Sequence, residues 1–204
     1  MKQYDESKLD LKLGSELVQL LIPHRRPLLL VDGVTGYRRA EQPTLWARRM
    51  ITANEEIFAG HFPDLHLWPG IYTQEGMGQA CHLLQVISTM QDAWEEKGNP
   101  AAQVLSALRN MEMGFRMHPG YRPADSAFLK ELGRDLARLG MSGSVDIRFL
   151  HPVFAGQCIE YVVTRTHVLD RLARFEVEAV CEGRQVAKGR ITGAIGPLLN
   201  ETRI

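Results

Sequence analysis

Residues 71–90 read IYTQEGMGQACHLLQVISTM, and this stretch decides the fold that we predict. Its apolar residues fall on nearly every side of a helix: Ile71, Met77, Ala80, Cys81, Leu83, Leu84, Val86, Ile87 and Met90. A helix that is apolar nearly all round belongs in the centre of a protein, with other elements wrapped around it. Its polar residues argue against a membrane span: Gln74, Glu75, Gln79, His82 and Gln85. We therefore predict a buried core helix.

Segments typical of strands surround this helix in the sequence. Four of them lie in the C-terminal third, separated by short turn-like stretches: 145–153, 159–167, 174–181 and 185–196. This spacing predicts an antiparallel meander. Further strands are expected at 28–32 (LLLVD) and 44–52, after a short helix capped by Ser15 that ends at Ile22, before Pro23. One long buried helix with an antiparallel sheet predicts an α+β architecture in which the sheet curls around the helix.

Residues 95–143 fit this plan least well. Residues 104–115 are compatible with a strand or a helix, whereas 128–139 (FLKELGRDLARL) have the pattern of an amphipathic helix. We interpret this segment as an inserted helical region or lid within a single domain that spans residues 1–204, a length that suits one domain.

The composition bears on the possible partners and on the compartment of the protein. Lys plus Arg and Asp plus Glu both number 24, so the overall charge gives no argument for nucleic acid. The three cysteines are widely spaced among apolar neighbours, which indicates reduced thiols in a cytoplasmic protein, and the N-terminus has no apolar signal-peptide core. No metal site is expected, because these histidines lack metal-like spacing: His66, His82, His118, His151 and His167. His24, in the rigid PHRRP corner, is interpreted as structural.

The stretch 59–75, AGHFPDLHLWPGIYTQE, holds the groups that could perform acid–base chemistry. His61 stands just before Phe-Pro, where Pro63 stiffens the backbone, and could act as a base; it could also be a loop histidine bonded to a backbone carbonyl. Glu75 lies early in the core helix, where burial would keep a carboxyl neutral and able to donate a proton. The alternative is a partly solvated carboxylate near the helix N-terminus.

Pro69-Gly70 precedes the core helix and adds a third group. A helix that begins at Gly70 or Ile71 exposes free backbone N–H groups, and glycine allows a substrate carbonyl to approach them. Such amides can stabilise an oxyanion. The alternative is that Pro69-Gly70 is an ordinary helix start with no role in substrate binding. The three groups together suit an elimination reaction.

The constellation GHFP-x5-PG-x4-E resembles the (3R)-hydroxyacyl-acyl carrier protein dehydratases of the FabZ type, which have a hotdog fold: an antiparallel sheet wrapped around a long central helix. Three further stretches agree with the family pattern: LIPHRRPLLLVDGV, QEGMGQAC and IRFLHPVFAGQCIEY. The matches run in order over residues 16–90 and 144–196. The resemblance implies that His61 and Glu75 are the catalytic pair and that the Gly70 N–H contacts the thioester carbonyl.

The resemblance also implies the reaction and its partners. Water would be eliminated from a (3R)-hydroxyacyl thioester to give the trans-2-enoyl thioester, in fatty acid, polyketide or other specialised acyl-chain biosynthesis. No cofactor is expected, since the substrate is carried on the phosphopantetheine of acyl carrier protein. Family members form homodimers in which the histidine and the glutamate of one site come from different subunits, and a higher oligomer is possible.

Departures from the family pattern concern the substrate more than the reaction. DLHLWPG replaces the usual run before the helix, and the residues preceding Glu75 are unusually polar. As tunnel-lining candidates we take Phe62, Trp68, Tyr72 and Met77. Arg25 and Arg26, the first of three arginine pairs, are candidates for binding the acidic carrier protein, with a solvated surface as the alternative reading. Alternatives for the whole protein are a hotdog thioesterase and a non-catalytic acyl-binding or partner subunit.

Overall fold

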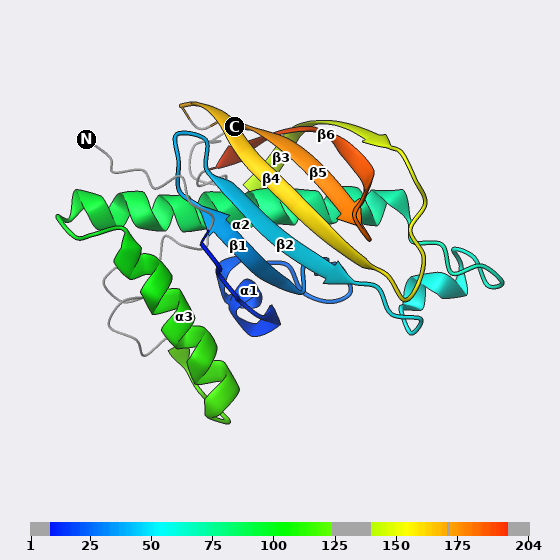
Figure 1. Cartoon of the computed structure of the whole chain (residues 1–204), viewed down its shortest axis with the longest axis horizontal. Coiled ribbons are helices and arrows are strands. Elements are labelled where there is room, and N and C mark those ends of the chain that lie inside the picture. Colours follow the sequence, from blue (N-terminus) through cyan, green and yellow to red (C-terminus); the bar gives the residue numbers. More distant parts are fainter. Residues whose placement is uncertain (1–8, 124–139, 171, 196–204) are drawn as a thin grey trace, which may run out of the picture.

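A computed structural model describes residues 9–123, 140–170 and 172–195 of the chain (Figure 1). The elements follow in this order: α1 (Ser15–Leu21), β1 (Gly33–Arg38), β2 (Thr44–Met50), the 3-10 helix η1 (Glu56–Ala59), α2 (Gly70–Glu96), α3 (Ala102–Met117), β3 (Gly140–Phe149), β4 (Cys158–Leu169), β5 (Leu172–Cys181) and β6 (Arg184–Ile195). The predicted helix 128–139 lies outside the described residues.

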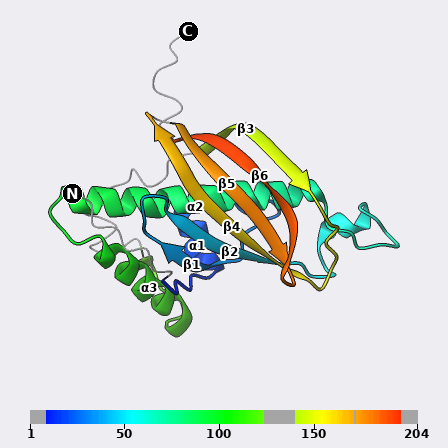
Figure 2. The same cartoon turned by 45° about the horizontal axis from the view of Figure 1, so that its top comes forward.

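The six strands form one antiparallel sheet in the order β1-β2-β4-β5-β6-β3. Of the four strands predicted as a meander in the C-terminal third, β4, β5 and β6 lie side by side as expected, whereas β3 pairs with β6 instead of β4 and lies at an edge of the sheet. The sheet curves over one side of α2, and the view turned by 45° shows the helix running beneath the strands (Figure 2). The predicted arrangement of a sheet wrapped around one long helix is therefore confirmed.

Helix α2 is longer than predicted and is the centre of the core. It has 27 residues, of which 15 are buried. The strand residues that alternate toward it, such as Phe175, Val177 and Ala179 on β5, are buried as well, while their neighbours face solvent. None of the helices in the described part of the chain has the length and apolarity needed to cross a membrane.

Two glycines inside α2, Gly76 and Gly78, differ in their surroundings. Because glycine costs helix stability, its presence at both positions predicts close approach by another backbone. A Cβ atom at Gly76 would instead collide with the ring and hydroxyl of Tyr161, a buried side chain on β4, whereas a Cβ at Gly78 would meet nothing within 4 Å. A side chain instead of another backbone approaches Gly76, and nothing approaches Gly78 closely, so the prediction was wrong at both positions.

Two predictions for the N-terminal segment were wrong, both because of long-range contacts. The helix cap is Gly14, not Ser15, and its N–H donates to the Glu112 carboxylate of α3 at 2.8 Å. Residues 28–32 are not a strand, because the Leu30 N–H donates to the Gln79 side chain on α2 at 2.8 Å. The sheet begins only at Gly33.

Helix α3 resolves the ambiguity left by residues 104–115. Its apolar face is buried in the same core cluster as α1, α2 and the sheet, through Val104, Leu105, Leu108 and Met111. Figure 1 shows α3 extending away from the sheet, beside α1. A one-sided apolar pattern of this kind favours a helix over a strand.

Candidate active site

His61 lies in the irregular segment between η1 and α2, and the backbone holds it there. Its N–H donates to the Ile57 carbonyl at 2.9 Å, and its Nδ1 lies 2.9 Å from the Leu67 carbonyl oxygen. A carbonyl can only accept, so Nδ1 carries a proton, and in the neutral ring Nε2 keeps the lone pair that a base needs. The peptide bond between His61 and Phe62 is cis, and the two rings stack at 4.4 Å. His61 can therefore bond the Leu67 carbonyl through Nδ1 and still act as a base through Nε2.

A cavity of about 420 Å³, the His61 cavity, brings His61 together with the start of α2. Its lining includes His61, Trp68, Gly70, Phe149 and His151. Gly70 is the first residue of α2, so its amide has no carbonyl of an earlier turn to bond. A Cβ at Gly70 would lie 3.1 Å from the Phe149 ring, which shows how closely the cavity wall approaches this amide.

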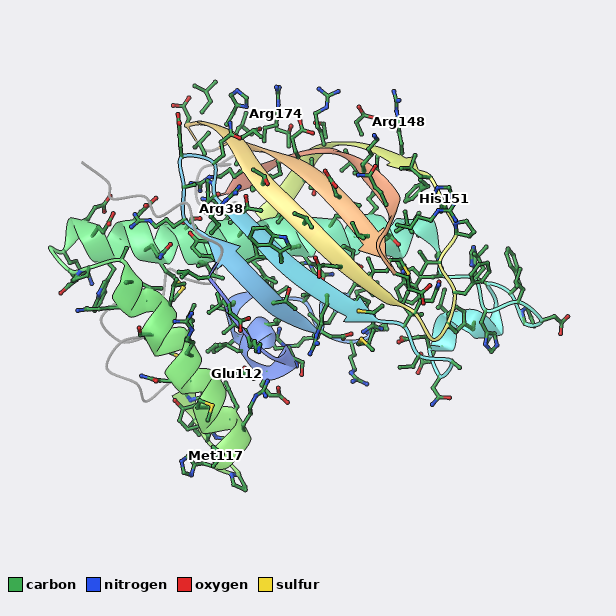
Figure 3. All side chains as sticks on the ribbon, viewed as in Figure 1. Arg38, Glu112, Met117, Arg148, His151 and Arg174 are labelled. Atoms are coloured by element: carbon green, nitrogen blue, oxygen red, sulfur yellow. The ribbon has the colours of Figure 1, made fainter. Side chains whose placement is uncertain are left out.

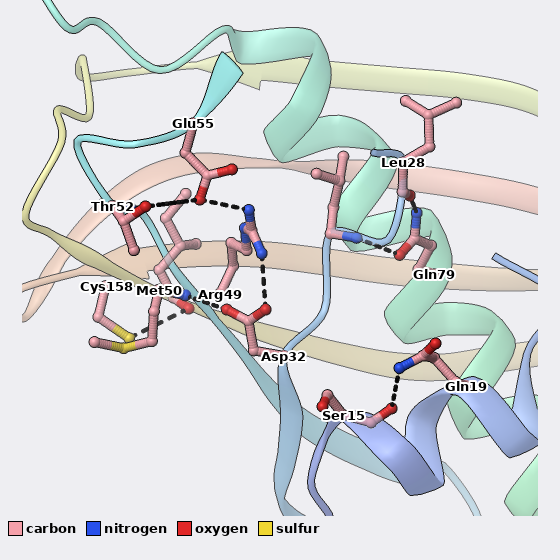
Figure 4. Close-up of polar contacts among 12 residues, drawn as sticks. Ser15, Gln19, Leu28, Asp32, Arg49, Met50, Thr52, Glu55, Gln79 and Cys158 are labelled. Carbon is pink, nitrogen blue, oxygen red and sulfur yellow. Dashed lines mark hydrogen bonds and ion pairs between the residues drawn. The ribbon is translucent and has the colours of Figure 1, made fainter. Parts of the chain in front are cut away.

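An ion-pair network fixes the segment that precedes Gly70. Arg49, whose side chain is 12% exposed, contacts Asp32 and Glu55 at 2.7 Å each (Figure 4). The Asp32 carboxylate also accepts a hydrogen bond from the Met50 N–H. The Arg49 guanidinium lies 5.5 Å from the centre of the Trp68 ring, and Trp68 is buried. The network thus contacts the segment before Gly70 through Trp68.

Glu75 lies on α2 and opens into a different cavity of about 340 Å³, the Glu75 cavity. The wall that α2 contributes contains Glu75, Gly78, Gln79, Cys81, His82 and Gln85. The Glu75 side chain is 45% exposed, which corrects the expectation that it is buried within the chain. Its Oε1 accepts a hydrogen bond from Gln79 Nε2 at 2.9 Å.

The structure does not bring His61 and Glu75 together in one cavity of a single chain. His61 and Gly70 share the first cavity, and Glu75 lines the second. The side chains of Val145 and Phe149, at 39% and 50% exposure, leave apolar surface on β3, the strand at one edge of the described sheet.

Two histidines that the sequence analysis set aside line these cavities. His24 Nε2 lies 3.4 Å from Glu75 Oε1, and burial lowers the pKa of His24 despite the attraction of Glu75. His151 lines the His61 cavity, and Figure 3 places it where the chain leaves β3. Neither position carries a local signal of this role in the sequence, because both contacts depend on the packing of distant segments.

The four tunnel-lining candidates differ in their position relative to the two cavities. Trp68 lines the His61 cavity. The Tyr72 ring packs edge-on against the Trp68 ring, with 5.3 Å between the ring centres. Phe62 is 48% exposed, whereas Met77 is fully buried in the core, and neither residue lines the two cavities. Met77 is thus a packing residue in this chain.

The arginine pairs separate into buried and exposed groups. Arg39 is buried and contacts Glu95 at 2.6 Å, and Arg49 belongs to the network described above. Arg25 and Arg26 are exposed, next to His24 at the Glu75 cavity. Within the described ranges, no group of three or more His, Cys, Asp or Glu side chains is arranged to hold a metal ion.

Comparison with solved structures supports the fold. A chain of the dehydratase heterocomplex ApeI:P from Xenorhabdus doucetiae aligns with a TM-score of 0.53 and 18% identity, over 89% of this chain and 91% of that one. The model of the FabA-like domain family matches residues 22–120, which include His61, Gly70 and Glu75. The sheet, the central helix and this match define a hotdog protein with a FabA-like domain.

Sequence comparison narrows this class to a family. The 3-hydroxyacyl-acyl-carrier-protein dehydratase FabZ of Helicobacter hepaticus is 33% identical over 115 residues, which are 54% of this chain and 68% of that protein. The FabZ of Neisseria meningitidis is 41% identical over 80 residues, 39% of this chain and 52% of that protein. The chain thus spans about half the length of the first curated relatives it matches. It belongs to the FabZ family of 3-hydroxyacyl-acyl-carrier-protein dehydratases.

Proposed function

We propose that this protein is a dehydratase that eliminates water from a 3-hydroxyacyl thioester to give the trans-2-enoyl thioester. One observation carries the proposal: the Leu67 carbonyl fixes the proton of His61 on Nδ1, which leaves Nε2 as a base in the cavity that also contains the Gly70 amide. A base and an oxyanion donor in one cavity suit proton removal next to a thioester carbonyl.

The elimination follows from these positions. His61 Nε2 takes the proton from C2, and the Gly70 N–H donates to the thioester oxygen, where negative charge develops. The electron pair of the C2–H bond forms the C2–C3 double bond as the C3–O bond breaks. Glu75 gives its proton to the departing hydroxyl, which leaves as water. The reverse sequence hydrates the enoyl thioester.

We further infer that each site is shared between two subunits of a homodimer. The support is that His61 and Glu75 line separate cavities in one chain, that Glu75 is half-exposed there, and that β3 presents apolar side chains at a sheet edge. In a symmetric dimer the His61 cavity of one subunit would face the Glu75 cavity of the other.

The proposed substrate is carried by acyl carrier protein, in fatty acid or another acyl-chain biosynthesis. Exposed Arg25 and Arg26 beside the Glu75 cavity suit the phosphate of phosphopantetheine and an acidic carrier, and no further cofactor is needed for this chemistry. Three free cysteines, Cys81, Cys158 and Cys181, support a cytoplasmic location.

The test is water elimination from 3-hydroxyacyl thioesters, followed as loss of the mass of water from the acyl group. Wild type should turn over, and His61→Ala and Glu75→Gln should each lower kcat by about 100-fold or more. His167→Ala, at an exposed position on β4, is the matched control and should behave as wild type. Turnover that survives in both site variants would contradict the assignment, and no turnover in the wild type would favour an acyl-binding protein.

A further inference from the structure

His24 contacts the candidate acid, although its segment lies about 50 residues away in the sequence from Glu75. It follows α1, in a stretch that is fixed to α2 by one side chain. Gln79 Nε2 donates to the Leu28 carbonyl at 2.6 Å, and Gln79 Oε1 accepts from the Leu30 N–H at 2.8 Å (Figure 4). The side chain that binds Glu75 therefore also anchors the segment that carries His24.

Both contacts of Glu75 are made by the same oxygen. Gln79 Nε2 lies 2.9 Å and His24 Nε2 lies 3.4 Å from Oε1. The longer contact is of the kind that shortens when a substrate closes a site. Two nitrogens at Oε1 leave Oε2 as the oxygen that is free to carry the acid proton.

We propose that His24 is a positioning residue for Glu75, and that its Nε2, together with the Gln79 amide, holds Oε1 so that Oε2 delivers the proton to the leaving hydroxyl. The inference rests on the proposed function, since it assigns a role within that reaction. It goes beyond the catalytic pair by adding a third side chain from a separate segment.

The surroundings of His24 suit a neutral imidazole. The titratable groups that face it are Glu75 and His82 on α2, with ring centres of the two histidines 6.2 Å apart, and Arg25 in its own segment. Burial and Arg25 both lower the pKa of His24, against the attraction of Glu75. A neutral ring can donate from Nε2 without adding a full positive charge, which would favour the ionised form of the acid.

The kinetic test compares His24→Ala with His24→Gln, whose amide can replace Nε2 as a donor. A short 3-hydroxyacyl pantetheine thioester serves as substrate, so that carrier-protein contacts of the neighbouring Arg25 do not enter. His24→Ala should lower kcat by about 10- to 100-fold with little change in KM, and His24→Gln should recover most of the loss. Equal losses in both variants, or none in His24→Ala, would overturn the proposal.

The pH profile of kcat distinguishes a His24 that orients Glu75 from a His24 that only stabilises the local structure. A donor at Oε1 favours the ionised carboxylate, so its loss keeps the acid protonated to higher pH. The alkaline limb of the profile should therefore move to higher pH in His24→Ala and return toward the wild-type position in His24→Gln. An unshifted limb would contradict a contact between His24 and the working acid.

An NMR titration of the His24 ring decides the contact without any turnover. The Glu75 carboxylate raises the pKa of His24, so this pKa should fall in full-length Glu75→Gln relative to wild type. An unchanged titration would overturn the inference. If wild type eliminates no water, the proposed function fails, while this titration still reports whether the two groups interact.

Discussion

The candidate base and the candidate acid are held in place by different parts of the protein. His61 is fixed by main-chain groups, the carbonyls of Ile57 and Leu67, in a segment without regular structure apart from η1. Glu75 is on a rigid helix, yet its carboxylate is oriented by the side chains of Gln79 and His24. The base should therefore tolerate changes in neighbouring side chains, and the acid should not.

Removal of Gln79 should have the largest effect on the acid side. Gln79→Ala leaves the buried Leu30 N–H and the Leu28 carbonyl without their partner and removes one contact of Glu75, so the free energy of unfolding should fall by about 2–4 kcal/mol. Urea unfolding measures this. The control is Gln85→Ala on the same helix, where the lost partners are the side chains of Arg165 and Thr89, with a cost of about 1 kcal/mol.

Gly76 and Gly78 test whether the helix that carries the acid is tightly constrained. Gly76→Ala forces a methyl group against Tyr161 and should lower the free energy of unfolding by about 1–3 kcal/mol. Gly78→Ala enters open space and should raise it by up to about 1 kcal/mol, because alanine favours the helix. Thermal unfolding of both variants gives the comparison; equal destabilisation would mean that Gly78 is also closely packed.

The base side has one position where side chains should matter. Arg49→Met removes both ion pairs beneath Trp68 and leaves two partly buried carboxylates, at a cost of about 2 kcal/mol in unfolding free energy. Arg190→Ala is the matched control, since its pair with Asp146 is more than half-exposed and should contribute less than about 0.5 kcal/mol. A similar loss in both variants would show that the Arg49 network adds nothing beyond surface charge.

Acid should weaken the protein partly through His24. Its pKa in the folded state is lowered from 6.5, so the unfolded chain takes up a proton that the folded chain does not. Stability from this group is present above the unfolded pKa and is lost as the pH falls below it. The melting temperature of wild type should drop more between about pH 7 and 5.5 than that of His24→Gln; parallel curves would argue against a neutral His24.

The smallest effect is expected at Leu67. Leu67→Ala keeps the carbonyl that binds His61 Nδ1, so kcat should change by less than about threefold. If this variant lost as much activity as His24→Ala, the proposed difference between a base held by main-chain groups and an acid held by side chains would be wrong.

The sequence was sufficient for features that depend on local pattern. The apolar residues of α2 and the spacing of β4, β5 and β6 led to the correct architecture, and the motifs led to the family. Contacts between distant segments could not be predicted from the sequence. Residues 28–32 look like a strand, but the Leu30 amide donates to Gln79, 49 residues away. Gly14, the cap of α1, donates its N–H to Glu112, 98 residues away.

The same distinction between local pattern and long-range contact applies to the candidate site. His61, Gly70 and Glu75 could be named from the motif, since residue type and order define it. The exposure of Glu75 and its contact with His24 could not, because both are set by how the segment after α1 packs on α2. Propensity likewise could not distinguish Gly76 from Gly78, since only Tyr161 makes them different.

Helix α3 has a consequence for how far the chain can be shortened. It was interpreted as part of an insertion or lid, but it buries four apolar side chains in the common core, and its Glu112 completes the start of α1. The core and the start of α1 therefore depend on contacts that α3 makes. Its deletion would expose core surface, so a variant without α3 should lose stability even if the helix never contacts a substrate.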